Sequence, residues 1–311
     1  MSKNGKLEIM SAWDFMARFP TDKDAREHIE RMRWGDEPIC THCGSRRISR
    51  VANEKPQPYR CKDCRKHFSV TTGTVFHSAN LSPRKCLYAI YLMVVAKKSI
   101  SSCQMARELG CTQKTAWYLA QRIRETWLNK FGVGDPMAGE VEVDETYVGG
   151  RERNKHASKK LRAGRGPVGK VPVVGMRERK SGRVKARPVA GTDATHLQSA
   201  VRSEVMPGST LYTDGHRAYR GMGEYQHEAV EHSVGEYVRD MAHTNGIESL
   251  WALLKRGYIG TFRHFSAKYL ARYVVEFATR HNRRHWDTMA HIEQSLRSAD
   301  GVLGYKALTA N

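Results

Sequence analysis

The chain has 311 residues, 40% of them apolar, which is enough for two or three domains with their own cores. Its 52 lysines and arginines outweigh 32 acidic residues and give a net charge of +20, which predicts DNA, RNA or another polyanionic partner. The longest apolar run, residues 86–96, is shorter than the roughly 20 residues of a membrane-spanning helix. Because no signal peptide opens the chain and the cysteine count is odd, we expect a reducing cytoplasm, where paired cysteines more often hold metal.

The N-terminal part is predicted to hold a metal ion. Residues 1–34 are expected to form a helical segment, and residues 35–76 a zinc ribbon. Two CxxC pairs supply four thiols, which are Cys40, Cys43, Cys61 and Cys64. Each pair can lie on a tight turn that points two thiolates at one ion, so two pairs complete a tetrahedral structural Zn²⁺ site. His42 and His67 are alternative ligands, although four cysteines already close the site.

Three helices are predicted within residues 77–132. Ser82-Pro83 begins the first, Gly110 ends the second, and Thr112 caps the third. Two helices joined by a short glycine turn are typical of a helix-turn-helix DNA-binding domain, although an ordinary helical hairpin has the same pattern. The side chains expected to face a DNA groove are Gln113, Lys114 and Tyr118.

From about residue 139 the pattern changes to strands, and residues 136–295 are predicted to form an α/β domain with a mixed sheet. The expected order of strand, hairpin, helix, strand, strand and helix is typical of an RNase H-like fold. The predicted elements are 140–147, 171–178, 184–190, 195–205, 209–213, 227–230, 243–257 and 266–284. The basic loop at 151–170 is expected to bind DNA, and residues 296–311 to form a C-terminal tail.

Three acidic residues are candidates for one catalytic metal site. Asp144 ends the first strand, Asp214 ends a later strand, and Glu248 lies in an amphipathic helix. In an RNase H-like sheet the two strands are neighbours and the helix packs against them. Phosphoryl transfer with two divalent ions about 3.5–4 Å apart needs carboxylates from separate elements. A carboxylate site on a strongly basic chain also suits a polyanionic substrate.

Alternatives stay open for the two strand-end positions. Glu142 or Glu145 could be the ligand in place of Asp144. The Asp214-Gly215 pair could be only a turn signal.

The helix offers alternatives as well. Asn245 shares a face with Glu248 and is the alternative third ligand. Lys255, two turns further along this face, is expected to contact a DNA phosphate or else to be an ordinary surface lysine. His243 is expected either to orient the site or only to cap the helix. The stripe predicted to be buried is Ile247, Leu250, Trp251 and Leu254.

Over about residues 10–290 the chain resembles the ISXO-type insertion-sequence transposases. The motifs that carry the resemblance are the two CxxC pairs, Val143-Asp-Glu-Thr-Tyr-Val-Gly-Gly150, Thr213-Asp-Gly215 and His243-Thr-Asn-Gly-Ile-Glu-Ser-Leu-Trp251. The resemblance implies an RNase H-like core, dependence on Mg²⁺ or Mn²⁺, binding to terminal inverted repeats and target DNA, and assembly as a homo-oligomer. It matches Asp144 and Asp214 to the two aspartates of the family, and its third position is Glu or Asn.

We therefore expect a DNA transposase that performs metal-dependent 3′-end cleavage and strand transfer in the bacterial cytoplasm, associated with the nucleoid. A DNA-binding regulator derived from a transposase and an RNase H-like nuclease are the alternatives. A tyrosine recombinase would use Tyr147, Tyr212 or Tyr219 as a nucleophile, but it would not need the acidic set.

Overall fold

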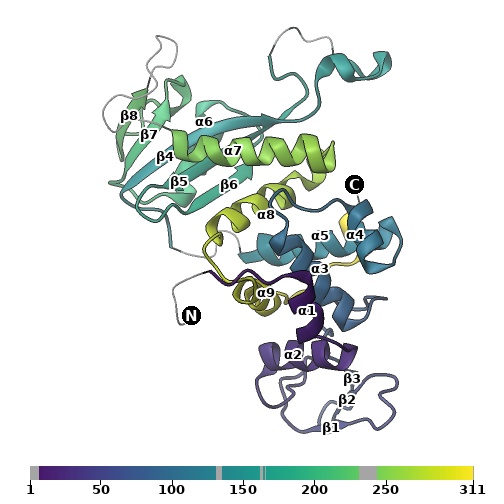
Figure 1. Ribbon diagram of the computed structural model, residues 1–311. Helices are drawn as coiled ribbons and strands as arrows, with labels where there is room; N and C mark the ends of the chain where they lie inside the picture. Colours follow the sequence, from purple (N-terminus) through teal and green to yellow (C-terminus); the bar gives the residue numbers. More distant parts are fainter. Residues whose placement is uncertain (1–6, 131–134, 162–163, 165, 231–243, 311) are drawn as a thin grey trace. The chain divides into compact units, whose positions relative to one another are not determined.

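The computed structural model describes residues 7–130, 135–161, 164, 166–230 and 244–310 (Figure 1). The chain forms two compact units, one of residues 1–129 with 285–311 and one of residues 130–284. Clusters of buried apolar side chains lie within each unit. Among the described residues, no helix has the length and apolar character needed to cross a membrane.

The unit of residues 130–284 is built on a five-stranded mixed sheet. The strands are β4 (Glu140–Val148), β5 (Val171–Glu178), β6 (Val184–Pro188), β7 (Thr210–Asp214) and β8 (Gln226–Val230). They lie in the order β6-β5-β4-β7-β8. The first three form an antiparallel meander, and β7 and β8 run parallel to β4. This is the predicted RNase H-like arrangement, and the α/β fold class is confirmed.

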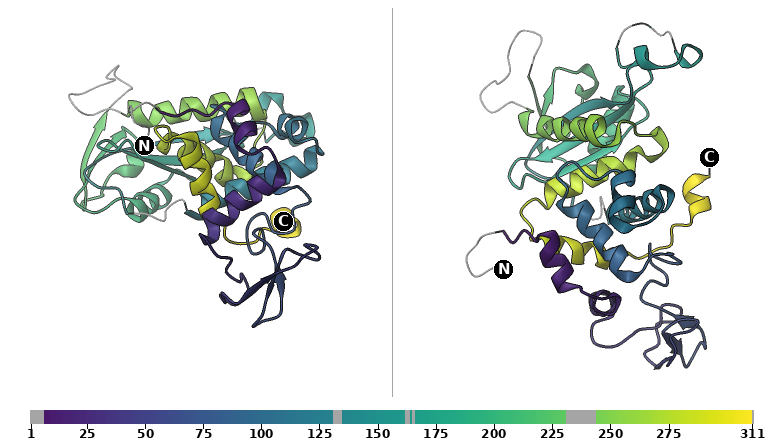
Figure 2. Two further views of the ribbon diagram at one scale, coloured as in Figure 1. Left: turned by 60° about the horizontal axis from the view of Figure 1, so that its bottom comes forward. Right: turned by 45° about the vertical axis from the view of Figure 1, so that its right-hand side comes forward.

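Helices cover both faces of this sheet. Successive side chains of β4 point alternately to one face and to the other, so the strand contributes to both hydrophobic clusters. Val141 and Val143 point toward α6 (Ala194–Glu204) and pack in its hydrophobic cluster. Val148 belongs to the opposite face, with α7 (Asn245–Gly257) and α8 (Leu270–Asn282). The predicted stripe of α7 is fully buried, and Figure 2 shows this green helix running across the sheet. Short helical turns lie at Glu152–Asn154, Ala157–Lys159, Arg217–Tyr219, Tyr258–Phe262 and Ala267–Tyr269.

The other unit joins a small sheet to a set of helices. Its antiparallel strands are β1 (Ile48–Arg50), β2 (Tyr59–Cys61) and β3 (His67–Phe68). Its helices are α1 (Ala12–Arg18), α2 (Asp22–Trp34), α3 (Pro83–Val95), α4 (Ser102–Leu109), α5 (Gln113–Lys130), α9 (Thr288–Arg297) and α10 (Tyr305–Thr309). Helix α9, distant in sequence, packs beside α2 and α3 (Figure 2). The chain thus returns to its N-terminal unit after the sheet domain.

The three helices predicted over residues 77–132 form as expected. Ser82 caps α3 and Pro83 is its first residue, as the sequence suggests. Gly110 ends α4 in the left-handed region at φ 59°, where glycine has no steric penalty. The Thr112 hydroxyl accepts the backbone N–H of Thr115 and so caps α5.

Candidate active site and zinc site

Asp144 and Asp214 lie side by side on neighbouring parallel strands. Asp214 is the last residue of β7, as predicted, whereas Asp144 lies in the middle of β4, because that strand continues to Val148 through its pairing with β5. The β4–β7 ladder pairs residue 143 with residue 213, so the next residue on each strand is one of the two aspartates. Neighbouring parallel strands are about 4.8 Å apart, and paired residues point to the same face. The structure therefore brings together the two carboxylates that the sequence placed at strand ends.

Two hydrogen bonds hold the Asp144 carboxylate, and its pKa is strongly raised. Its Oδ2 accepts the indole N–H of Trp251 at 2.9 Å, and its Oδ1 accepts the backbone N–H of Glu145 at 2.8 Å. Burial, followed by the charges of Glu145 and Asp214, raises the pKa of Asp144 to about 7. A carboxylate that is hard to ionise beside other carboxylates is the electrostatic situation that a bound cation relieves.

Glu145 lies on the α6 side of β4. Its Oε2 accepts the phenol of Tyr219 at 2.9 Å, and its Oε1 is 3.9 Å from His216 Nε2. Burial and the charge of Asp214 raise its pKa. Glu145 is thus electrostatically coupled to the aspartate pair, and it stays open as an alternative ligand.

Glu142, the other alternative to Asp144, has a structural role instead. Its side chain is 0% exposed and forms ion pairs with Arg177 at 3.1 Å and Arg179 at 3.3 Å. Its Oε2 also accepts the backbone N–H of Ile247 at 2.9 Å, in the first turn of α7. Since these partners enclose the carboxylate, it is unavailable to a metal ion. It anchors the start of α7 to the sheet.

Two glycines let α7 approach the sheet closely. A Cβ atom on Gly246 would lie 2.6 Å from Glu142 Oε2 and 2.5 Å from Arg177 Nη1. A Cβ atom on Gly175 in β5 would lie 2.5 Å from the Trp251 ring. The absence of side chains at these positions brings the Trp251 indole within reach of Asp144.

Asn245 and Glu248 are both exposed in the first turn of α7. The Glu248 carboxylate accepts the hydroxyl of Thr244 at 3.0 Å. Over the described chain, only the four cysteines form a group of three or more acidic, His or Cys ligand atoms that all lie within 4.8 Å of one another. The structure therefore does not bring Glu248 that close to Asp144 and Asp214. His243 lies outside the described residues.

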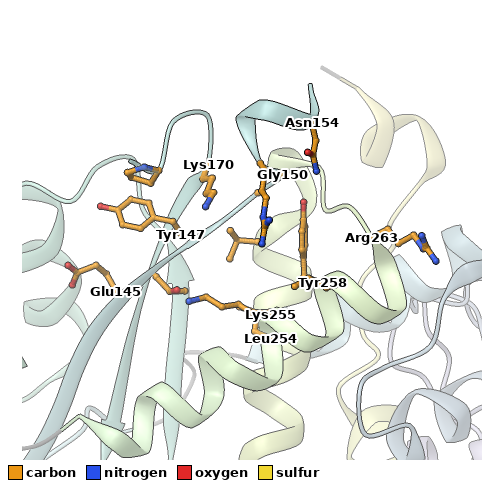
Figure 3. Close-up of a pocket in the computed structure, with 15 residues that line it drawn as sticks. Glu145, Tyr147, Gly150, Asn154, Lys170, Leu254, Lys255, Tyr258 and Arg263 are labelled. Carbon is orange, nitrogen blue, oxygen red and sulfur yellow. The ribbon is translucent and has the colours of Figure 1, made fainter. Parts of the chain in front are cut away.

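A cavity of about 860 Å³ opens beside the end of β4. Lys255 lines it from α7, together with Lys170 and Tyr258. Figure 3 shows Lys255 reaching along the cavity from α7 toward the strand. The residue predicted to contact phosphate is thus at a basic cavity in the same unit as the aspartates.

The four predicted cysteines do converge. Cys40 Sγ lies 3.6 Å from Cys64 Sγ, and Cys43 Sγ lies 3.7 Å from Cys61 Sγ. Tetrahedral Zn–S bonds of about 2.3 Å give sulfur–sulfur separations of roughly 3.8 Å, so the cluster fits Zn²⁺. Backbone N–H groups, first that of Cys64, lower the pKa of Cys61 to about 6 and favour its thiolate.

The side chains predicted to face DNA are all engaged within their own unit. The Gln113 amide donates to Ser102 Oγ at 2.7 Å, and the Tyr118 hydroxyl donates to the carbonyl of Leu303 at 2.5 Å. Lys114 Nζ lies 4.8 Å from the centre of the Tyr305 ring, and the Tyr118 and Tyr305 rings meet edge to face. The C-terminal segment thus covers part of the α5 surface.

Sequence reasoning missed three functional contacts. The Trp251 indole was predicted only as part of a buried stripe, and no periodicity indicates where its N–H points. Glu142 was predicted to share the polar face of its strand with Asp144, without its two arginines. The hydrogen bond from the Tyr219 phenol to Glu145 depends on the conformation of a turn after β7, and no sequence motif marks that turn.

Comparisons with known proteins identify the family of the chain. A family model for the ISXO2-like transposase domain matches residues 136–282, and one for a transposase zinc-ribbon domain matches residues 20–67. The chain is 30% identical over 275 residues to the uncharacterized protein in transposable element ISH50 of Halobacterium salinarum, which covers 84% of this chain and 91% of that protein. A chain in the crystal structure of a pre-cleavage Mos1 transpososome is 12% identical to this chain, with a TM-score of 0.25. The match covers 66% of this chain and 76% of that chain, and no conclusion is based on it.

A transposase zinc-ribbon domain on the same chain as an RNase H-like transposase domain defines a DDE-type transposase. The chain belongs to the ISXO2-like transposase family.

Proposed function

We propose that this transposase binds the terminal inverted repeats of an insertion sequence and catalyses metal-dependent 3′-end cleavage and strand transfer. The observation that supports this most directly is the adjacency of Asp144 and Asp214 on the neighbouring strands β4 and β7, where Trp251 fixes the first carboxylate. Paired carboxylates in a unit that also has a basic cavity suit a phosphodiester substrate.

The residues fit a divalent cation, Mg²⁺ or Mn²⁺. Oxygen donors suit these hard ions. Burial first, and then the charges of Glu145 and Asp214, raise the pKa of Asp144, and both effects make a bound cation favourable there. Bound there, two ions would polarise the phosphate, activate the attacking oxygen and stabilise the leaving oxygen.

For the third ligand we propose Glu248, with Asn245 as the alternative. Both lie in the first turn of α7, on an anchor made by Glu142 and Gly246. To reach an ion shared with the two aspartates, the Glu248 carboxylate must give up its hydrogen bond with the Thr244 hydroxyl. Lys255 is proposed to bind a phosphate of the DNA strand, since it is exposed at the cavity and has no described ion-pair partner.

Burial argues against a tyrosine nucleophile at two of the three candidate positions. It is the first cause that raises the pKa of Tyr212 and of Tyr219, so that their phenolates are harder to form. The third phenol, that of Tyr147, is hydrogen-bonded to the Thr192 hydroxyl, which is no general base.

We further propose that the zinc ribbon and helices α4–α5 bind double-stranded DNA and so direct the enzyme to its substrate. The net charge of +20 supports this role. In this proposal the protein assembles as a homo-oligomer on the two ends of the element. The assembly acts in the cytoplasm, associated with the nucleoid.

Strand joining tests the proposed function. Labelled duplexes from the DNA that flanks the gene are incubated with Mg²⁺ or Mn²⁺ and a plasmid, using the wild type and Asp144→Asn. We expect labelled ends joined to the plasmid only with metal and intact Asp144. Metal-dependent nicking without joining would favour a nuclease, and binding without either reaction would favour a regulator.

A further inference from the structure

The cavity at the end of β4 is lined in part by two glycines, Gly149 and Gly150. Gly149 follows β4 with φ +157°, and a Cβ atom there would lie 3.1 Å from Lys170 Cα. A Cβ atom on Gly150 would lie 3.9 Å from the Tyr258 hydroxyl. Gly149 therefore lets the end of the basic loop approach the strand closely, whereas a side chain at Gly150 would make only an ordinary contact with Tyr258. The two glycines border an open space of about 860 Å³.

The charges around this cavity are positive and not neutralised. Arg151, Lys170, Lys255 and Arg263 line it, and none of them forms an ion pair with another described residue. Figure 3 shows Lys170 and Lys255 pointing toward the same space from opposite sides. In the same view Glu145, the acidic lining residue, points to the other side of β4. Anionic groups would therefore be favoured inside the cavity.

An aromatic ring stands beside these cations. Tyr258 is half-buried and packs edge to face against Phe265, with ring centres 5.0 Å apart. Its hydroxyl points into the cavity and away from α7 (Figure 3). A tyrosine held on one side by another ring offers a rigid surface for a flat group, at little cost in side-chain entropy.

We propose that this cavity binds unpaired nucleotides of the DNA strand next to the cleavage site, with phosphates on the lysines and a base stacked on Tyr258. A positively charged groove with an aromatic platform is the usual combination for single-stranded nucleic acid. A paired base inside a duplex cannot stack on Tyr258 in this way, because neighbouring base pairs already cover both of its faces. This inference rests on the proposed function, since it assumes that DNA is cut at Asp144 and Asp214.

The test measures the preference for unpaired ends. Full-length protein is mixed, without divalent ions, with terminal duplexes that are either fully paired or carry three unpaired nucleotides, one of them 2-aminopurine. Anisotropy gives both dissociation constants, and fluorescence reports stacking of the probe base. We expect binding of the unpaired end to be about tenfold tighter, as one stacked base allows, together with quenching of the probe.

Matched variants separate the contributions of ring and charge. Tyr258→Phe keeps the ring and should keep both the preference and the quenching, whereas Tyr258→Ala should lose both. Lys255→Ala should reduce the preference, while Lys268→Ala, which removes an exposed lysine outside the cavity, should leave it unchanged. Equal affinity for both ends, or a preference that survives Tyr258→Ala, overturns the proposal. If the wild type still joins ends to a plasmid in that case, the proposed function stands without this pocket.

Discussion

The indole N–H of Trp251 donates a hydrogen bond to Oδ2 of Asp144 over 2.9 Å, and so links the helix α7 to strand β4. The ring reaches this position because Gly175 has no side chain to block it. The same helix presents Glu248 about one turn earlier and Asn245 nearly two turns earlier. Trp251 therefore couples the orientation of the strand carboxylate to the position of the proposed third ligand.

Trp251→Phe should impair catalysis more than folding. Phenylalanine keeps most of the packing but removes the N–H, and a hydrogen bond to a charged group contributes about 1.5–3 kcal/mol. We expect strand transfer about tenfold slower or more. The bond also lowers the pKa of Asp144, so its loss should move the acidic limb of the pH–rate profile to higher pH. Trp13→Phe, at a site 84% exposed, is the control, and an unchanged profile for Trp251→Phe would argue against this contact.

Stability without metal should fall as the pH rises. The pKa of Asp144 is raised to about 7 from an ordinary value of 3.8, so the folded state binds more protons than the unfolded state between these values. The free energy of unfolding should therefore decrease over this window, and each pKa unit corresponds to about 1.4 kcal/mol. Asp144→Asn should flatten the dependence, and Mg²⁺ should restore stability to the wild type at pH 8. Thermal melts with EDTA and with Mg²⁺ measure this, and a wild-type stability that rises from pH 4 to 7 would contradict it.

Gly246→Ala should destabilise the sheet domain although alanine is the better helix former. The added Cβ would lie 2.6 Å from Glu142 Oε2, inside the ion-pair cluster that anchors α7. We expect a loss of about 1–3 kcal/mol, as for other overpacked sites. Gly260→Ala, with nothing within 4 Å of its Cβ, is the matched control. Equal melting temperatures for the two variants would show that the close approach is not needed.

Cys61→Ser should release zinc and weaken binding to terminal DNA. Three cysteines cannot close the tetrahedral site, and structural zinc contributes directly to folding. Zinc content, measured by atomic absorption, should fall from about one ion per chain toward zero. Cys103→Ser, an exposed cysteine outside the ribbon, should keep its zinc. Full zinc content in Cys61→Ser would refute the ribbon assignment.

Deleting residues 302–311 should strengthen DNA binding if α5 contacts DNA. The deletion frees Lys114 and Tyr118 from Tyr305 and Leu303, while the backbone bond from Gly301 to Gly73 stays in place. Tyr118→Phe, which loses only the hydrogen bond to Leu303, should have a smaller effect. Anisotropy with terminal duplexes measures both, and weaker binding after the deletion would mean that the tail itself contacts DNA.

The parts of the site that follow from local pattern could be predicted. Strand alternation and chain order were enough to place Asp144 beside Asp214, and the 3.6-residue period gave the buried stripe of α7. The two CxxC pairs gave the metal cluster for the same reason, since turns determine their geometry locally.

The remaining features depend on how distant elements meet. Alternation along the strand shows that Glu142 shares a face with Asp144. It does not show that Glu142 is enclosed by the first turn of α7, by Arg177 of β5 and by Arg179 just after β5. Helical register predicts that Glu248 shares an exposed face with Asn245, but it does not predict that the Glu248 carboxylate accepts a hydrogen bond from the Thr244 hydroxyl. Which face a residue occupies is a local property, whereas its partner is set by tertiary packing.

The most direct test of the central claim, that Asp144 and Asp214 hold the catalytic metal, is a change of metal preference. Strand joining by Asp214→Cys is measured in Mg²⁺ and in Mn²⁺, beside the wild type. A thiolate binds the hard Mg²⁺ ion poorly and is better tolerated by Mn²⁺. We predict that the variant loses joining in Mg²⁺ and regains part of it in Mn²⁺. Joining in Mg²⁺ at the rate of the wild type would contradict the assignment.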